Sequence, residues 1–161
     1  MKRFNLSLYL AGLVVIACAF GGFATERAWA TPGQDVTTTI LTGPVPFDEI
    51  DAKSLVGGHH AKIKTKGPSD VYIVLNVIKP GGHTGWHSHP GISFVTVKSG
   101  TVTEYRGDNP SEPTTYSAGM GLVEEAGHVH IFRNEGSTNV ELVAFQLLPA
   151  GAPRRIDESA P

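Results

Sequence analysis

Residues 81–89 read Gly-Gly-His-Thr-Gly-Trp-His-Ser-His, and residues 127–134 read Gly-His-Val-His-Ile-Phe-Arg-Asn. Side chains two positions apart on a β-strand point to the same face, so His87 and His89 can present two imidazoles side by side. His130, on a second strand, can supply a third imidazole. Because three convergent ring nitrogens make a chelate, the two segments predict a metal site divided between two strands.

Short hydrophobic stretches separated by Gly and Pro turns surround these two segments. Residues 71–79 (VYIVLNVIK) are apolar at nearly every position, which predicts a strand buried on both faces. Residues 92–98 and 101–105 flank a Ser-Gly turn and predict a hairpin. Further short strands are expected at 36–41, 62–66, 114–116, 121–124, 129–133 and 140–148. Many short strands with Gly and Pro turns, and no amphipathic helix pattern, predict an all-β sandwich or barrel.

The spacing of glycines and histidines resembles the two signatures of the cupin family. The first signature places a His-x-His pair and a glutamate between two glycines, and the second ends in a histidine followed by an asparagine. All but two signature positions agree, the matches being Gly81, His87, His89, Gly100, Gly119, Gly127, His130 and Asn134. Ser93 stands where the first signature has glutamate, and Glu125 stands where the second has proline.

This resemblance implies an all-β cupin-type jelly-roll β-barrel, or double-stranded β-helix, with its core over residues 71–149. It also implies that His87, His89 and His130 bind a divalent transition metal. Iron, zinc, manganese, nickel and copper all accept imidazole ligands, so the metal's identity stays open. The alternative is a cupin that has lost its metal and keeps hydrogen-bonded core histidines.

Ser93 removes the usual carboxylate from the implied ligand set. Two other histidines are candidates to replace it: His83, which we prefer, and His128, which would share strand parity with His130 and so face the interior. Glu124 and Glu125 are expected in a solvated turn, with a role as general base at the site as the lesser alternative.

The first thirty residues predict a signal peptide. Lys2 and Arg3 precede an apolar run over residues 6–23, and Ala-Trp-Ala at 28–30 suits cleavage after Ala30. The alternatives are an uncleaved membrane anchor, or a lipobox in which Cys18 is lipidated. Cleavage after Ala30 would leave no cysteine, so a metal would be held by N and O donors.

The predicted organisation is a signal peptide at 1–30, an N-terminal arm with first strands at 31–70, the barrel at 71–149 and a flexible tail at 150–161. We expect export to the bacterial periplasm or the extracellular space. Stable membrane association is not expected after cleavage unless the chain is lipidated at Cys18. A homodimer that exchanges the arm at 31–41 is a further expectation.

A formal net charge of −2 and the lack of a long basic run argue against nucleic acid as a partner, which leaves a small-molecule ligand or substrate. The favoured function is a metal-dependent enzyme with dioxygenase-like oxidation, and a lyase or isomerase is also compatible. The alternative function is a non-catalytic periplasmic protein that binds a metal or small ligand in the same barrel.

Overall fold

The structure is a computed structural model that describes residues 30–161. The predictions for the signal peptide, the membrane anchor and Cys18 therefore lie outside the described residues. Every regular element between Ala30 and Pro161 is a β-strand. The strands are β1 (Gln34–Phe47), β2 (Asp51–Val56), β3 (His59–Lys64), β4 (Ser69–His83), β5 (His87–Ser88), β6 (Ile92–Ser99), β7 (Thr101–Arg106), β8 (Asn109–Ser117), β9 (Gly121–Glu124), β10 (His130–Arg133), β11 (Val140–Pro149) and β12 (Ile156–Asp157).

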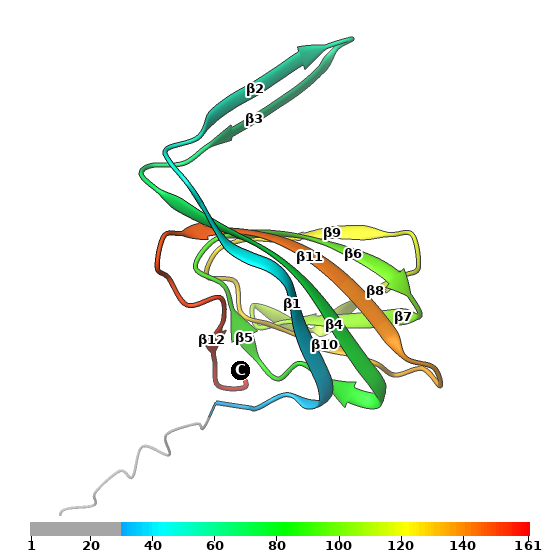
Figure 1. Cartoon of the computed structure of the whole chain (residues 1–161). Coiled ribbons are helices and arrows are strands. Elements are labelled where there is room, and N and C mark those ends of the chain that lie inside the picture. The colour runs from blue at the N-terminus through cyan, green and yellow to red at the C-terminus, as the bar shows by residue number, and fades with distance from the viewer. Residues whose placement is uncertain (1–29) are drawn as a thin grey trace, which may run out of the picture.

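Ten of these strands form one antiparallel sheet that curls over on itself into a barrel (Figure 1). One half of the sheet has the order β1-β4-β11-β6-β9, and the other half has the order β8-β7-β10-β5-β12. The halves join where His83 of β4 pairs with Arg133 of β10. This confirms the predicted all-β jelly-roll barrel. The expected strand at 36–41 is part of the longer β1, which pairs along β4 of its own chain.

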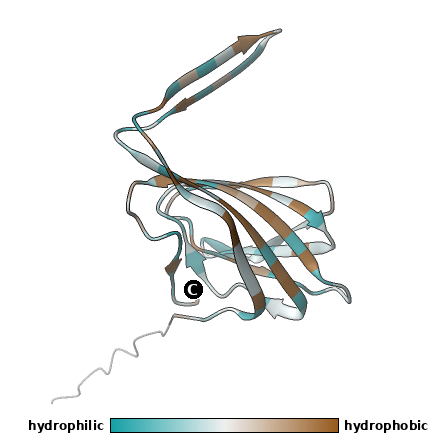
Figure 2. Cartoon of the chain, in the orientation of Figure 1, coloured by the Kyte–Doolittle hydropathy of each residue, from teal (hydrophilic) through white to brown (hydrophobic). Residues whose placement is uncertain are grey.

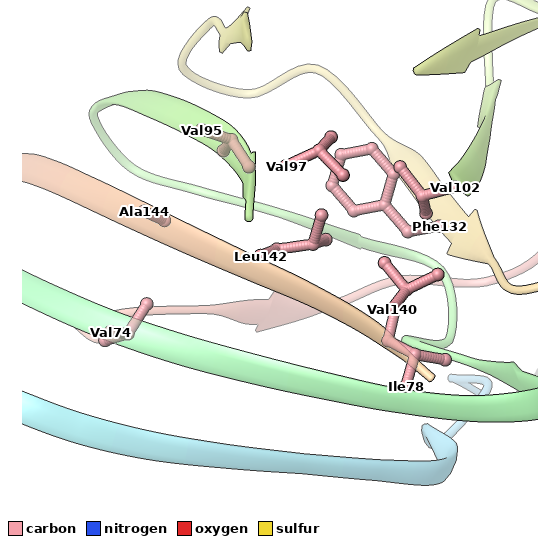
Figure 3. Close-up of a cluster of buried hydrophobic side chains, with 9 residues drawn as sticks. All are labelled: Val74, Ile78, Val95, Val97, Val102, Phe132, Val140, Leu142 and Ala144. Atoms are coloured by element: carbon pink, nitrogen blue, oxygen red, sulfur yellow. The ribbon is translucent and has the colours of Figure 1, made fainter. Parts of the chain in front are cut away.

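The two halves meet in a hydrophobic core. Val102 of β7 and Phe132 of β10 pack against side chains from β4, β6 and β11 on the opposite half (Figure 3). The members on that half are Val74, Ile78, Val95, Val97, Val140, Leu142 and Ala144. Burial of each larger member stabilises the fold by about 1.5–3 kcal/mol, so this core holds the two halves closed.

Strands β2 and β3 form a separate two-stranded hairpin that projects away from the barrel (Figure 1). Every residue of both strands is exposed to solvent. The hairpin mixes hydrophobic and hydrophilic residues, as do β4 and β11 in the barrel (Figure 2). His59 and His60 begin β3 and are exposed.

The C-terminal residues differ from the flexible tail expected at 150–161. Strand β12 pairs with β5, with Ile156 opposite Ser88 and Asp157 opposite His87. The Ser88 hydroxyl donates a hydrogen bond of 2.8 Å to Oε1 of Glu158. These contacts satisfy backbone and side-chain polar groups at the edge of β5 and hold the C-terminal segment against the barrel. No helix of membrane-spanning length and hydropathy occurs between Ala30 and Pro161.

Candidate metal centre

The loop between β4 and β5 positions the first histidine pair. Gly85 adopts a φ of +73°, and a side chain there would overlap the carbonyl oxygen of Thr31. The neighbouring Trp86 N–H donates to the Thr31 hydroxyl at 2.9 Å. This close approach fixes the path of the chain into β5, where His87 pairs directly with His130 of β10.

The three histidines predicted from the sequence converge inside the barrel. Their ring centroids lie 4.3 Å apart for His87 and His130, 4.9 Å for His87 and His89, and 5.6 Å for His89 and His130. One ring nitrogen from each lies within 4.8 Å of the others. All three side chains are buried. This arrangement matches the spacing argument, which rested on strand parity for the first pair and a second strand for His130.

Backbone carbonyls select the tautomer of each ring. Nδ1 of His87 lies 2.9 Å from the Gly85 oxygen, Nδ1 of His89 lies 2.8 Å from the Arg154 oxygen, and Nδ1 of His130 lies 3.1 Å from the His128 oxygen. A carbonyl can only accept a hydrogen bond, so each Nδ1 carries the proton. In the neutral rings the lone pair is then on Nε2, the atom free to bind a metal.

A buried glutamate completes the cluster, and it is not the one that the family signature would supply. Glu124 of β9 is only 6% exposed. Its Oε1 lies 3.2 Å from Nε2 of His130, and its Oε2 lies 3.4 Å from Nε2 of His89. The expectation of a solvated turn at Glu124 was therefore wrong. An acidic residue at the end of the otherwise apolar strand predicted at 121–124 was the available signal.

Strand pairing explains how Glu124 takes the place of the missing carboxylate. Ser93 of β6 occupies the signature's glutamate position, and it pairs directly with Glu124 in the register of β6 and β9. Directly paired residues of antiparallel strands share a face of the sheet. The carboxylate therefore reaches the cluster from the neighbouring strand.

Ser93 itself is fully buried, and its side chain is hydrogen-bonded to Glu124. The Gln146 amide donates to the Ser93 hydroxyl at 3.4 Å. Ser93 therefore supports the carboxylate of Glu124 within the cluster.

The two histidines considered as replacement ligands lie outside the cluster. The imidazole of His128 is 45% exposed, 3.5 Å from Glu125 and 2.7 Å from the Arg106 guanidinium. The parity argument failed for His128 because β10 begins only at His130. His83 is half-buried at the end of β4, where its Nδ1 accepts a hydrogen bond of 3.1 Å from the Gly85 N–H.

Burial and neighbouring charges shift the ionisation of the cluster. Burial lowers the pKa of His87 well below its ordinary value, and the charges of His130 and Arg155 lower it further. Burial also lowers the pKa of His89, against the opposing effect of the Glu124 carboxylate. His87 and His89 are therefore neutral at pH 7, which is the state that binds a metal.

The other two members of the cluster form a coupled pair. Burial alone would lower the pKa of His130, but the Glu124 carboxylate outweighs it and the pKa of His130 is raised. Burial alone would raise the pKa of Glu124, but His130 and His89 outweigh it and the pKa of Glu124 is lowered. Glu124 is therefore ionised at pH 7, and a cation between it and His130 is favoured.

The residues present fit a divalent transition metal. Nε2 of His130 is buried and, within the described part of the chain, has no hydrogen-bond partner, although the Glu124 carboxylate is close. An ion bound between the three Nε2 atoms and Glu124 would satisfy that nitrogen. Three imidazoles and one carboxylate suit Zn, Fe, Mn, Ni and Cu alike.

Comparison with known protein families finds a match over the part of the chain that holds this site. The family model for the cupin domain matches residues 74–146, a span that contains all three histidines and Glu124. The chain carries a cupin domain. No curated protein matches the sequence significantly.

Solved structures extend the cupin likeness over more of the chain. The polyketide cyclase RemF from Streptomyces resistomycificus is 15% identical, with a TM-score of 0.55 over 80% of this chain and 76% of that one. A cupin-2 domain protein from Rhodospirillum rubrum is 14% identical, with a TM-score of 0.53 over 80% of this chain and 68% of that one. At these identities the likeness describes the cupin fold alone.

Proposed function

We propose that this cupin is an exported, metal-dependent enzyme that carries out a dioxygenase-like oxidation of a small molecule. The observation that carries the proposal is the convergence of three buried imidazoles and the Glu124 carboxylate on one point. Four protein ligands leave open positions on a metal that prefers five or six, as a catalytic site requires.

The chain's own residues would prepare the site for such chemistry. His87, His89, His130 and Glu124 would hold a divalent transition metal, which when bound supplies a Lewis acid and, for iron or copper, a redox centre. The carbonyls that fix each Nδ1 proton keep the imidazoles in the binding tautomer. Apolar side chains from the core, among them Val95, Leu142 and Ala144, line part of the adjoining cavity.

A non-catalytic binding protein is the second candidate function. One observation favours it: the only carboxylate that lines the cavity among the described residues is Glu124, which is already engaged by His89 and His130. No separate general base is then available beside a ligand in this cavity. The same metal site would in that case hold a metal or a small ligand without turnover.

Metal analysis followed by oxygen uptake tests the proposal. The purified protein is expected to bind about one equivalent of a transition metal at the cluster. Iron-loaded protein is then expected to consume O2 with members of a panel of small phenols, thiols and carboxylic acids. The variant His87→Ala should lose metal and uptake, and His60→Ala, at an exposed hairpin histidine, should keep both.

The possible results separate the two functions. Oxygen uptake that is unchanged in His87→Ala contradicts the oxidation. Bound metal with no turnover of any panel member favours the binding protein. Mass spectrometry of the N-terminus tests export, with cleavage after Ala30 expected. A chain that still begins at Met1 would contradict cleavage, and a lipidated Cys18 would show processing at the lipobox instead.

A further inference from the structure

Two arginines of the C-terminal segment lie in the wall of the cavity beside the metal centre. The cavity has a volume of about 50 Å3, and Arg154 and Arg155 line it together with His87 and His89. This volume holds only a few non-hydrogen atoms. Both arginines lie beyond the span that the cupin model matches.

Within the described residues, Arg154 forms no ion pair with an acidic side chain. Its guanidinium is half-buried and donates a hydrogen bond from Nη1 to Oε1 of Gln146 at 3.3 Å. A guanidinium offers five N–H donors, so most of those on Arg154 are available to a ligand. Leaving a half-buried charge uncompensated is costly unless an anion joins it.

The charges around Arg154 make the binding of an anion in the cavity more favourable. Arg155 is ion-paired with Asp157 at 2.5 Å, but its positive charge lies close enough to lower the pKa of Arg154 further than burial does alone. Glu124 faces the same cavity and its negative charge opposes this lowering of the Arg154 pKa, but its carboxylate is engaged by His89 and His130. A divalent metal at the cluster would make the cavity more positive still.

We infer that the cavity binds a small carboxylate anion and that Arg154 is the residue that recognises it. The inference rests on the proposed function, because it names the substrate class of the same site. The planar fork of a guanidinium matches the two oxygens of a carboxylate. Val95, Leu142 and Ala144 supply apolar walls, which suit the short alkyl part of an organic acid better than a fully hydrated inorganic oxyanion.

Calorimetric titration of the full chain, in the zinc-loaded and metal-free forms, tests the inference without requiring turnover. Acetate and propionate are the probes, and inorganic phosphate is the comparison anion. The variant Arg154→Met keeps an apolar stem of similar length and removes the charge. Arg133→Met is the matched control, because Arg133 is exposed on β10 and lies over the Tyr105 ring, 5.3 Å from its centroid.

The wild-type protein and Arg133→Met are expected to bind both carboxylates more tightly than phosphate. Loss of a charged hydrogen-bond donor should weaken carboxylate binding about tenfold to a hundredfold in Arg154→Met, with zinc content unchanged. Unchanged carboxylate affinity in Arg154→Met overturns the inference, and so does phosphate binding as tight as that of propionate.

The same measurements separate this inference from the proposed function. Zinc retained with no carboxylate binding by the wild-type protein overturns the carboxylate site and leaves the metal centre standing. Carboxylate binding that depends on Arg154 in a chain that retains no metal supports the carboxylate site and contradicts the metal-dependent function.

Discussion

The barrel and the β2–β3 hairpin are built from the same kind of strand, yet only the barrel buries its side chains. Leu142 in β11 is 1% exposed, whereas Leu55 in β2 is 64% exposed. Both strands are antiparallel and paired in regular register. The difference arises because β11 faces a second half of the sheet and the hairpin faces none. The local sequence pattern therefore determines whether a segment forms a strand. Its contribution to the free energy of unfolding depends on whether a second layer of the sheet packs against it.

The largest expected difference comes from one substitution made in both regions. Leu142→Ala should lower the free energy of unfolding by about 2–5 kcal/mol, because it leaves a cavity in the core. Leu55→Ala should change it by less than about 0.5 kcal/mol, because the side chain is already in water. Chemical denaturation of the two variants measures both values. Equal losses would show that the hairpin is as tightly packed as the barrel.

A second matched pair tests how tightly the loop before β5 is held. Gly81 and Gly85 have φ values of +77° and +73°, but only Gly85 lies against backbone that a side chain would overlap. Gly81→Ala should cost about 1 kcal/mol for the left-handed conformation alone. Gly85→Ala should cost more and should also weaken metal binding, since the loop must move. Thermal unfolding with and without zinc checks this, and equal effects of the two substitutions would contradict it.

Glu124 of β9 takes the place of the carboxylate that the family signature has at Ser93 of β6. Substitution of Glu124 should therefore have a smaller effect, which is confined to metal affinity. Glu124→Gln keeps the shape of the side chain and removes its charge, so metal affinity should fall about tenfold to a hundredfold. The adjacent Glu125→Gln should leave affinity unchanged, because that carboxylate is 68% exposed and faces His128. Competition with a metal-sensitive dye measures both affinities. A loss in Glu125→Gln equal to that in Glu124→Gln would contradict the assignment.

The smallest expected effect is removal of the hairpin itself. Asp51 and Lys64 are directly paired, so an Asn-Gly turn can join them in place of residues 52–63. The melting temperature should change by less than about 2 °C, since no apolar contact with the barrel is lost. Metal content should also be unchanged. Differential scanning calorimetry measures the first quantity, and a drop of several degrees would show that the hairpin contributes to the barrel's stability.

The sequence predicted the parts of the site that depend on local geometry. His87 of β5 and His89, directly after that strand, converge as expected from their spacing of two residues, and His130 joins them because β10 lies beside β5. The fold was predictable for a similar reason, since the turn residues and apolar stretches mark most of the strands. The short strand β12 was not predicted, because two residues carry too weak a pattern.

The rest of the site depends on contacts between distant segments, which spacing along the chain does not show. Glu124 reaches the cluster only through its register with Ser93. The C-terminal segment joins the site through pairing with β5 and through the Arg154 carbonyl on His89. His128 shows the converse error, because strand parity was extended beyond the first residue of the strand.

The carbonyl of Arg154 has a consequence for mutagenesis. This oxygen orients His89, while the side chain of the same residue lines the cavity. Scanning substitutions at position 154 change only the guanidinium and leave the carbonyl in place. An amide-to-ester replacement of the Arg154–Arg155 linkage does the opposite, because it weakens the carbonyl as an acceptor and keeps both side chains. Semisynthesis can therefore separate the orientation of a metal ligand from the recognition of an anion at a single residue.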